Sequence, residues 1–349
     1  MSRRRRHHHH RIKTFNPTHL INKASHQAAK PEYQTKHQFS DFAIVDQLKR
    51  SIYNRGFKTP TPIQDQAINH ILNGKDLVGS ANTGTGKTAA FLIPLIHNLS
   101  QDKSKKVLIM TPTRELAIQI RKEFKIFGQG MNLYSTLCIG GTSIKRQIQS
   151  LKRQPHFVIG TPGRLIDLTK RRKLNLNQFS VVVLDEVDRM LDMGFVNDMK
   201  YMIGRLPKQR QSLFFSATLP DKLNHIIHRF VKNPVRIEIK SQQRAANVDQ
   251  NIVKVNGRSK VQLLHSLLNK QGFDKVLVFG RTKHGLNRLS QKLHKKGHRV
   301  ETIHGNKSQN QRKRDLKKFK DSKVDVLLET DVASRGLDLD DITHVINYD

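Results

Sequence analysis

Two short stretches carry residue types whose spacing suits phosphate chemistry. The first, ANTGTGKT, spans Ala81 to Thr88 between the strand-like DLVGS and the helix-like AAFLIPLIHNL. Glycines let the backbone wrap around phosphates, Lys87 can reach terminal phosphates, and the Thr88 hydroxyl can bind Mg²⁺ at the amino end of a helix. The strict pattern has glycine where Ala81 stands, but the other positions keep their spacing, so a Gly-rich turn without a ligand is the weaker interpretation. The sequence predicts a nucleotide site formed by Ala81, Asn82, Thr83, Gly84, Thr85, Gly86, Lys87 and Thr88.

The second stretch, VVVLDEVDRM, is an apolar run that ends in three acids, Asp185, Glu186 and Asp188. Beside a phosphate loop, Asp185 is expected to hold the Mg²⁺ shell and Glu186 to orient or deprotonate the attacking water. Carboxylates at the end of a strand can also be solvated surface groups, and this stretch alone leaves both interpretations open. Its combination with Lys87 favours the catalytic interpretation.

These residues must be positioned by a repeating pattern of elements that begins at Phe39. The apolar runs KVLIMT, HFVIGT, VVVLDE and SLFFSAT alternate with amphipathic stretches such as RELAIQIRKEF and DKLNHIIHRFV. That alternation predicts βαβ units, and therefore an α/β fold with a parallel sheet and helices on both faces. Ligands of such sheets bind outside the carboxyl ends of the strands, which is where Asp185 and Glu186 fall.

The pattern is interrupted once, by the polar segment SQQRAANVDQ after VRIEIK, and resumes with KVLVFG, RVETIH, VDVLLET and THVINYD. We therefore predict a linker over residues 241–249 between two α/β domains at 39–240 and 250–349. Residues 1–38 are expected to form a basic, flexible arm.

Composition narrows the classes of partner. The chain has 349 residues, enough for two domains, and its 63 basic and 28 acidic residues give a net charge of +35, which indicates a polyanion such as nucleic acid more than a membrane surface. The longest apolar runs fall short of the roughly 20 residues that a bilayer requires. The single cysteine, Cys138, excludes a disulfide framework and is expected to be a buried thiol. A reducing compartment, the cytoplasm, is the expected location.

The amino-terminal segment SRRRRHHHHRIK allows two interpretations, because the first acid of the chain is Glu32. A mitochondrial transit peptide would be acid-poor and rich in arginine, but this segment lacks a sustained amphipathic stripe. We favour an arm that contacts nucleic acid nonspecifically. The four consecutive histidines have no spaced ligand geometry, so no metal is assigned there.

Beyond these features, the chain from Phe39 to Asp349 resembles the DEAD-box RNA helicases, superfamily-two ATPases with two RecA-like domains. GFKTPTPIQ, which ends at Gln64, resembles the family's Q motif, and Phe39 lies at the position of its isolated upstream aromatic residue. The resemblance implies that Gln64 binds the adenine edge and that Phe57 stacks on its ring. A Gln amide offers one donor and one acceptor group, which suits adenine. A surface amide is the alternative for Gln64.

The resemblance also implies RNA contacts in the first domain. The motifs are PTRELA, the pair Gly140 and Gly141, and TPGR, and they supply charge, hydroxyls and close backbone approach. A threonine followed by proline is also an ordinary helix start, so each motif alone is weak evidence for RNA binding. The order of the motifs along the chain is the stronger evidence. The implied RNA-binding residues are Thr113, Arg114, Gly141, Thr161 and Arg164.

The motif SAT, Ser216 to Thr218, resembles the element that couples the ATP state to the RNA state through hydrogen bonds to Asp188; a local capping arrangement is the alternative. The resemblance implies catalytic roles for Ser216 and Thr218 beside Lys87, and nucleotide contact by Asp188.

In the second domain, VFGRT and HGNKSQNQR resemble motifs that bind phosphates. TDVASRGLD resembles a motif that contacts both RNA and the nucleotide. The implied RNA contacts are Thr282, Arg312 and Thr330, and Asp338 approaches the nucleotide. His304 is expected to be a polar residue at a strand end.

Two departures from the family pattern stand out. Val187 replaces the usual alanine of the DEAD tetrapeptide, for which only a packing adjustment is expected. The chain ends at VINYD, before the segment where the family carries HRIGRTGR, whose arginines stabilise the transferred phosphate. An arginine finger contributes about 10³ to 10⁵ in rate, so we expect poor ATP hydrolysis, an incomplete second domain, and either a fragment or a natural short form.

The resemblance therefore implies a monomeric ATP-dependent RNA helicase that uses ATP and Mg²⁺. RNA, structured or double-stranded, would be read mainly through its backbone. An ATP-gated RNA clamp without turnover and a DNA-directed translocase are the alternatives; RNA-dependent phosphate release tests the first, and deoxy strands test the second. Ribosomal and RNA-decay partners both stay open.

Overall fold

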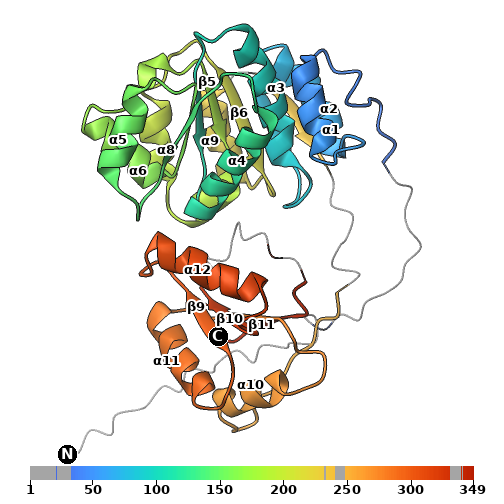
Figure 1. Ribbon diagram of the computed structural model, residues 1–349, viewed down its shortest axis with the longest axis vertical. Coiled ribbons are helices and arrows are strands. Elements are labelled where there is room, and N and C mark those ends of the chain that lie inside the picture. Colours follow the sequence, from blue (N-terminus) through green and yellow to red (C-terminus); the bar gives the residue numbers. More distant parts are fainter. Residues whose placement is uncertain (1–20, 22–32, 232, 240–247, 331–338, 340) are drawn as a thin grey trace, which may run out of the picture.

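The computed structural model describes residues 21, 33–231, 233–239, 248–330, 339 and 341–349. It contains two parallel sheets, each covered by helices, in two successive parts of the chain (Figure 1). The predicted α/β class with two RecA-like parallel-sheet domains is confirmed.

The first sheet has seven strands in the order β3-β4-β2-β5-β6-β1-β7, and the pairings between neighbours are parallel. Parallel neighbours bring their carboxyl ends to one edge, so the loops that follow β1, β5 and β6 lie side by side. The strands are β1 (Leu77–Ser80), β2 (Val107–Met110), β3 (Ser135–Cys138), β4 (Phe157–Gly160), β5 (Val181–Leu184), β6 (Gln211–Ser216) and β7 (Val235–Glu238).

Helices cover both faces of this sheet because its central strands are apolar along their length. In β2, Val107 and Ile109 face one core cluster, and Leu108 and Met110 face the other, as the alternation of side chains along a strand requires. The first cluster includes α1 (Asp46–Asn54), α2 (Pro62–Leu72), α3 (Lys87–Gln101) and α4 (Arg114–Phe127). The second includes α5 (Ile144–Lys152), α6 (Pro162–Lys170), α7 (Val187–Asp192), α8 (Val196–Ile203) and α9 (Asp221–Phe230).

The second sheet has four parallel strands in the order β11-β8-β10-β9. Helices α10 (Lys260–Leu268) and α11 (Lys283–His294) contribute to one core cluster, and α12 (Gln309–Lys320) contributes Phe319 to another. The strands are β8 (Val276–Phe279), β9 (Val300–Ile303), β10 (Val326–Glu329) and β11 (His344–Asn347).

The two domains meet where α12 approaches α4, as Figure 1 shows. Glu115 of α4 accepts a hydrogen bond from Gln309 at 3.2 Å and lies 3.2 Å from the Arg312 guanidinium. These side chains join the two sheets through a polar contact at their facing edges.

The structure bears on the predicted boundaries in part. Most of the expected arm, and most of the expected linker at 241–249, lie outside the described residues. Residues 33–38, however, pack on the first domain, because Tyr33, Lys36 and His37 donate hydrogen bonds to Asp65. Contacts of the first domain therefore extend upstream of Phe39, and the predicted domain and linker boundaries stay predictions.

The predicted buried thiol is confirmed. Cys138 is fully buried at the end of β3, and burial raises the pKa of its thiol to about 12, so it is an unreactive core residue. Val187 is also fully buried, in the cluster below the sheet's second face. Within the described parts of the chain, no helix is both long and apolar enough to span a bilayer.

Candidate active site

The phosphate-loop motif lies at the carboxyl edge of the first sheet, between β1 and α3. The backbone amide of Ala81 continues the β1–β6 ladder by donating to the Ser216 carbonyl at 3.0 Å. Gly86, the residue before the helix, has a φ of 88°, and a Cβ there would collide with the Gln64 amide. Glycine is therefore required at this position for both its conformation and its surroundings.

Lys87 folds back over the loop that precedes it. Its ammonium group donates to the carbonyl oxygens of Ala81 and of Asn82, the latter at 2.9 Å, and the Thr85 hydroxyl donates to the Asn82 carbonyl at 2.7 Å. The side chain is buried, and burial lowers the pKa of Lys87 although the nearby carboxylate of Asp185 opposes that shift. A buried cation whose hydrogen-bond partners are carbonyls is available to an incoming phosphate.

The acids after β5 lie next to this lysine. Asp185 is buried, its amide continues the ladder to Met110, and its carboxylate accepts from the Glu186 amide at 2.9 Å. Burial, and then the Glu186 carboxylate, raise the pKa of Asp185 to about 7, and Lys87 only partly opposes them. A buried carboxylate of this kind is stabilised when a cation binds beside it.

Glu186 occupies a left-handed backbone conformation, φ 53° and ψ 53°, at the start of α7. This turn directs the chain away from the strand, and the Glu186 carboxylate forms an ion pair with Arg189 on the next helical turn. Non-glycine residues in this conformation cluster at functional sites, where surrounding contacts maintain the strain.

Asp188 links β5 to the loop after β6. Its Oδ2 accepts from the Ala217 and Thr218 amides at 3.1 and 3.0 Å and from the Thr218 hydroxyl at 3.1 Å. The Ser216 hydroxyl accepts from the Asp188 amide at 3.3 Å and donates to the Thr218 carbonyl at 2.6 Å. The predicted contact between Asp188 and the SAT motif is present, and its role in coupling the two ligands stays a prediction.

Gln64 lies in the first turn of α2 and is tied to the phosphate loop. Its side-chain oxygen accepts from the Thr61 amide at 2.9 Å, and its Nε2 donates to the Gly86 carbonyl at 3.1 Å. It is 2% exposed, so it is not a free surface amide. Phe57 is half-buried, with its ring centroid 6.2 Å from that of Phe39. Adenine recognition by Gln64 and Phe57 stays a prediction.

The predicted RNA-binding residues of the first domain gather around Arg114. Its guanidinium lies against Gly140 and Gly141, where a Cβ would collide with it. Arg164 donates to the Thr142 carbonyl, next to Gly141, at 3.4 Å, and Arg312 pairs with Glu115, next to Arg114, so three arginines come close together across the domain boundary. Burial lowers the pKa of Arg114, Arg312 and Arg164 lower it further, and Glu115 opposes the shift. Such a concentration of cations attracts phosphates.

The hydroxyls in this region have structural partners of their own. Thr113 caps α4 by accepting from the Leu116 amide at 3.3 Å, and Thr282 caps α11 by accepting from the Gly285 amide at 3.0 Å. Thr161 precedes α6 without a side-chain capping bond. Thr330 is half-buried after β10, and Asp338 lies outside the described residues.

His304 is buried at the end of β9, and its Nε2 lies 2.9 Å from the Asn287 side-chain oxygen, in agreement with its expected structural role.

The structure adds residues that the sequence interpretation did not select. Glu115 and Gln309 join the domains, and both belong to motifs already noted, PTRELA and HGNKSQNQR, so the signal was present. Glu329, at the end of β10, is fully buried; burial raises the pKa of its carboxyl group to about 9, although Arg312 opposes the shift. A carboxyl group in such surroundings is neutral at pH 7, and no motif pointed to it.

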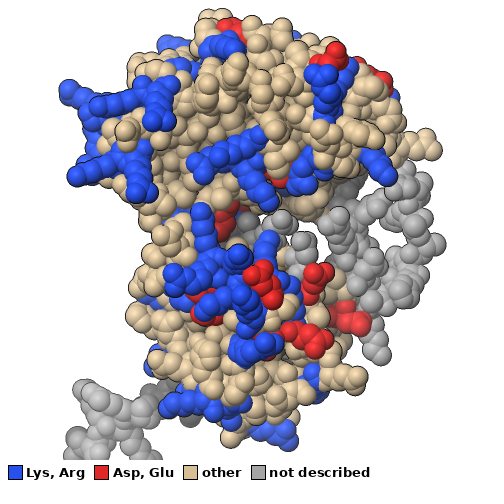
Figure 2. Space-filling model, in the orientation of Figure 1, with Lys and Arg blue, Asp and Glu red and all other residues tan. Residues whose placement is uncertain are grey.

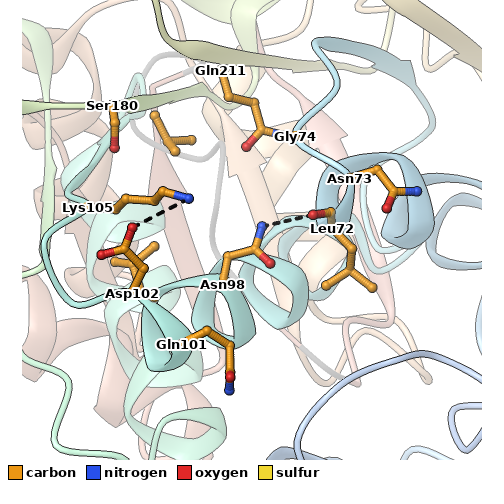
Figure 3. A pocket seen from close by; sticks show the side chains of 11 residues that line it. Leu72, Asn73, Gly74, Asn98, Gln101, Asp102, Lys105, Ser180 and Gln211 are labelled. Atoms are coloured by element: carbon orange, nitrogen blue, oxygen red, sulfur yellow. Dashed lines mark hydrogen bonds and ion pairs between the residues drawn. The ribbon is translucent and has the colours of Figure 1, made fainter.

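A separate pocket of about 400 Å³ lies at the opposite edge of the first sheet (Figure 3). Asn98 donates to the Leu72 carbonyl at 3.3 Å there, and Lys105 lies 3.7 Å from Asp102. Because this pocket adjoins the amino ends of β5 and β6, it is distinct from the predicted nucleotide site.

Across the described residues, no three His, Cys, Asp or Glu side chains are grouped to hold an ion. Mg²⁺ in nucleotide sites, however, takes one or two protein ligands together with phosphate oxygens and water. A carboxylate and a hydroxyl of the kinds that Asp185 and Thr88 carry fit that donor set, and Asp185 lies close enough to Lys87, the residue before Thr88, to affect its pKa.

Fold and site together define a protein with two RecA-like parallel-sheet domains and a phosphate-loop motif at the carboxyl edge of the first sheet. The DEAD/DEAH box helicase family model matches residues 61–226, and the helicase conserved C-terminal domain model matches residues 259–349. A DEAD box protein from Methanococcus jannaschii is 38% identical, with a TM-score of 0.57 over 89% of this chain and 85% of that chain. The chain belongs to the DEAD-box helicase family.

Among curated relatives, the ATP-dependent RNA helicase CshA of Listeria monocytogenes is 44% identical over 314 residues, which are 89% of this chain. The chain spans about 60% of the length of that relative.

Two structures of a single-residue variant of Dbp5 from S. cerevisiae, each 27% identical, differ in their similarity to this chain. The form bound to RNA and ADP BeF3 has a TM-score of 0.76 over 89% of this chain and 80% of that chain. The form bound to a Gle1 variant and IP6 has a TM-score of 0.66 over 90% of this chain and 80% of that chain.

Proposed function

We propose that this chain is the core of an ATP-dependent RNA helicase, in which ATP binding and hydrolysis drive RNA binding and local duplex remodelling. The observation that carries the proposal is the convergence of Lys87, Asp185 and the Asp188–Thr218 contact at the loop after β1. These groups come from three adjacent strands, and each has the chemistry that phosphoryl transfer requires.

In this proposal, Lys87 exchanges its carbonyl partners for the terminal phosphates of ATP. Thr88 and Asp185 would hold Mg²⁺, which would supply positive charge to the phosphate oxygens. Glu186 orients the attacking water and accepts its proton, and Gln64 exchanges one of its present partners for the adenine edge.

RNA would bind through its phosphates and 2′-hydroxyls across both domains, at Arg114, Arg164 and Arg312. Support comes from the proximity of these arginines and from the higher similarity to the RNA-bound form of the Dbp5 variant than to its Gle1-bound form. Because ATP and RNA would both favour the closed arrangement, each should tighten the binding of the other by the same factor. Thr113, Gly141, Thr161, Thr282 and Thr330 are proposed as further RNA contacts.

We further propose that the protein acts as a monomer in the cytoplasm.

The test compares phosphate release from ATP with no nucleic acid, with an RNA, and with a DNA of the same sequence. RNA should stimulate release, and the deoxy strand should not. Equal stimulation by both strands would favour a duplex translocase, and stimulation by neither would favour an ATP-gated RNA clamp without turnover. The Lys87→Ala variant measures how much of the phosphate release comes from contaminating ATPases.

A further inference from the structure

The Asp65 carboxylate, one residue after Gln64, is buried and saturated with hydrogen bonds. Its side chain is 1% exposed. The Tyr33 hydroxyl and the Lys36 amide each donate to Oδ2 at 2.8 Å, the His37 amide donates to Oδ1 at 3.2 Å, and His37 Nδ1 lies 2.6 Å from Oδ1. Burial by itself would raise the pKa of Asp65, but the bonds from Lys36, His37 and Tyr33 outweigh it and lower the pKa. The carboxylate is therefore ionised, and its hydrogen bonds are of the stronger, charge-assisted kind.

These bonds hold the upstream segment, which we define as residues 33–42. Two aromatic residues of the upstream segment are also buried: Phe39 is 7% exposed and Phe42 is 1% exposed. The Phe39 ring lies 6.1 Å from Phe42 and 6.2 Å from Phe57, and the His37 ring lies 5.5 Å from Phe42. The upstream segment thus links Asp65 to Phe57 through a continuous set of ring contacts.

The first turn of α2 is a junction between the upstream segment and the phosphate loop. Consecutive residues of a helix point about 100° apart, so Gln64 and Asp65 face different neighbours. Gln64 reaches the Gly86 carbonyl of the phosphate loop, and Asp65 reaches the upstream segment. A rotation or shift of this turn would displace Gln64 and release Phe57 at once.

We propose that Asp65 is a positioning residue for nucleotide recognition: by fixing the upstream segment on α2, it holds Gln64 and Phe57 where adenine is to bind. This inference rests on the proposed ATP site and adds to it a residue that never touches the nucleotide. Its effect should fall on the base and not on the phosphates, because the bonds of Lys87 to the loop carbonyls do not involve Asp65.

The experiment measures dissociation constants of the full chain for ATP and for GTP by titration. Asp65→Ala should weaken ATP binding about tenfold, the equivalent of about 1.4 kcal/mol, and should weaken GTP binding by a smaller factor, because Phe57 can stack on either purine whereas Gln64 suits adenine; the preference for adenine should therefore fall. Tyr33→Phe removes one donor alone and should move ATP affinity in the same direction by a smaller factor. In the Asp65→Ala background, Tyr33→Phe should add nothing, since its acceptor is gone.

The matched control is Asp46→Ala, which removes an acid from the first turn of α1, away from these contacts, and should change neither constant. Gln64→Ala separates the two proposals. If Gln64→Ala abolishes the preference for ATP while Asp65→Ala and Tyr33→Phe preserve it, the positioning role is wrong and the adenine site stands. If Gln64→Ala also preserves the preference, the adenine site itself is wrong. Equal weakening of ATP and GTP by Asp65→Ala and by Tyr33→Phe would assign Asp65 to general stability and overturn the proposal.

Discussion

The predicted site residues described in the first domain contact other residues of the same domain, whereas Arg312, a predicted RNA contact of the second domain, forms an ion pair with the first domain. Lys87 donates to carbonyls of its own loop, and Asp188 accepts from the loop after the adjacent strand. In the second domain, Arg312 has its ion-pair partner, Glu115, on α4 of the first domain.

The predicted nucleotide site lies at the carboxyl edge of the first sheet, and the contacts described for Lys87 and Asp188 lie within that domain. The arginine-rich region exists only where the two sheets approach each other, so it can respond to what is bound between them. Figure 2 shows the abundant Lys and Arg on one face of both domains, where they add long-range attraction for a polyanion.

The largest expected effect is on chemistry within the first domain. Glu186→Gln should keep the shape of the side chain but remove its basicity, so turnover should fall by about 10³-fold, within the range for loss of a general base. The measurement is RNA-stimulated phosphate release, in a form of the protein that turns over ATP. ATP affinity close to that of the parent is the internal control, and retained turnover would exclude the role.

Lys87→Ala should weaken ATP binding by about 100-fold, because loss of one partner from a buried charge pair costs about 2–5 kcal/mol. Titration with ATP measures this. Lys105→Ala is the matched control, since Lys105 pairs with Asp102 at the opposite edge of the same sheet. Similar loss in both variants would contradict the assignment of the loop.

Asp185→Asn should stabilise the ligand-free protein above about pH 7 and leave it unchanged near pH 4. The pKa of Asp185 is raised to about 7 in the fold, so the folded state binds a proton that the unfolded state releases above about pH 4, and stability is lost as pH rises from there to 7. We expect a gain of several degrees in Tm at about pH 8, since about 1 kcal/mol moves Tm by about 2–4 °C in a domain of this size.

Thermal unfolding in acidic, neutral and mildly alkaline buffer checks the sign of this effect. Asp198→Asn, a change on α8 outside the site, is the control. A gain that is the same at each pH would show that ionisation of Asp185 is not its cause.

Glu115→Gln tests the contact between the domains. It removes the charge that faces Arg312, so the factor by which RNA tightens ATP binding should fall about tenfold, while ATP affinity without RNA stays the same. The control is Glu123→Gln on the same helix, where the glutamate pairs with Arg55 on the surface. Equal coupling in both variants would show that the α4–α12 contact does not transmit it.

The smallest expected effect concerns salt. Arg164→Gln should reduce the slope of log affinity against log salt by about 0.7 for single-stranded RNA, if its guanidinium neutralises one phosphate. Arg171→Gln is the control, because Arg171 follows the last residue of α6 and lies 2.6 Å from the Asp167 carboxylate, which Arg164 approaches only to 3.8 Å. An unchanged slope for Arg164→Gln would show that Arg164 does not neutralise an RNA phosphate.

Much of the fold could be predicted because strand and loop signals are local. Each predicted apolar run became a strand, and the residues that follow β1 and β5 reached the predicted edge. The orientation of Glu186 in a left-handed turn was not predictable in this way, since a glutamate seldom adopts that conformation without surrounding contacts.

The sequence by itself determined which residues stand at strand ends, because the period of apolar side chains and the Gly-Lys-Thr spacing depend only on neighbours along the chain. Tertiary structure alone decided which of them meet. Asp188 reaches Thr218 because β5 and β6 are adjacent in the sheet, Asp65 reaches Tyr33 because the chain doubles back over α2, and Glu115 reaches Arg312 because two domains approach. The physical reason is that these contacts join residues 30 to about 200 positions apart, and their pairing depends on the packing of whole elements and not on any local preference.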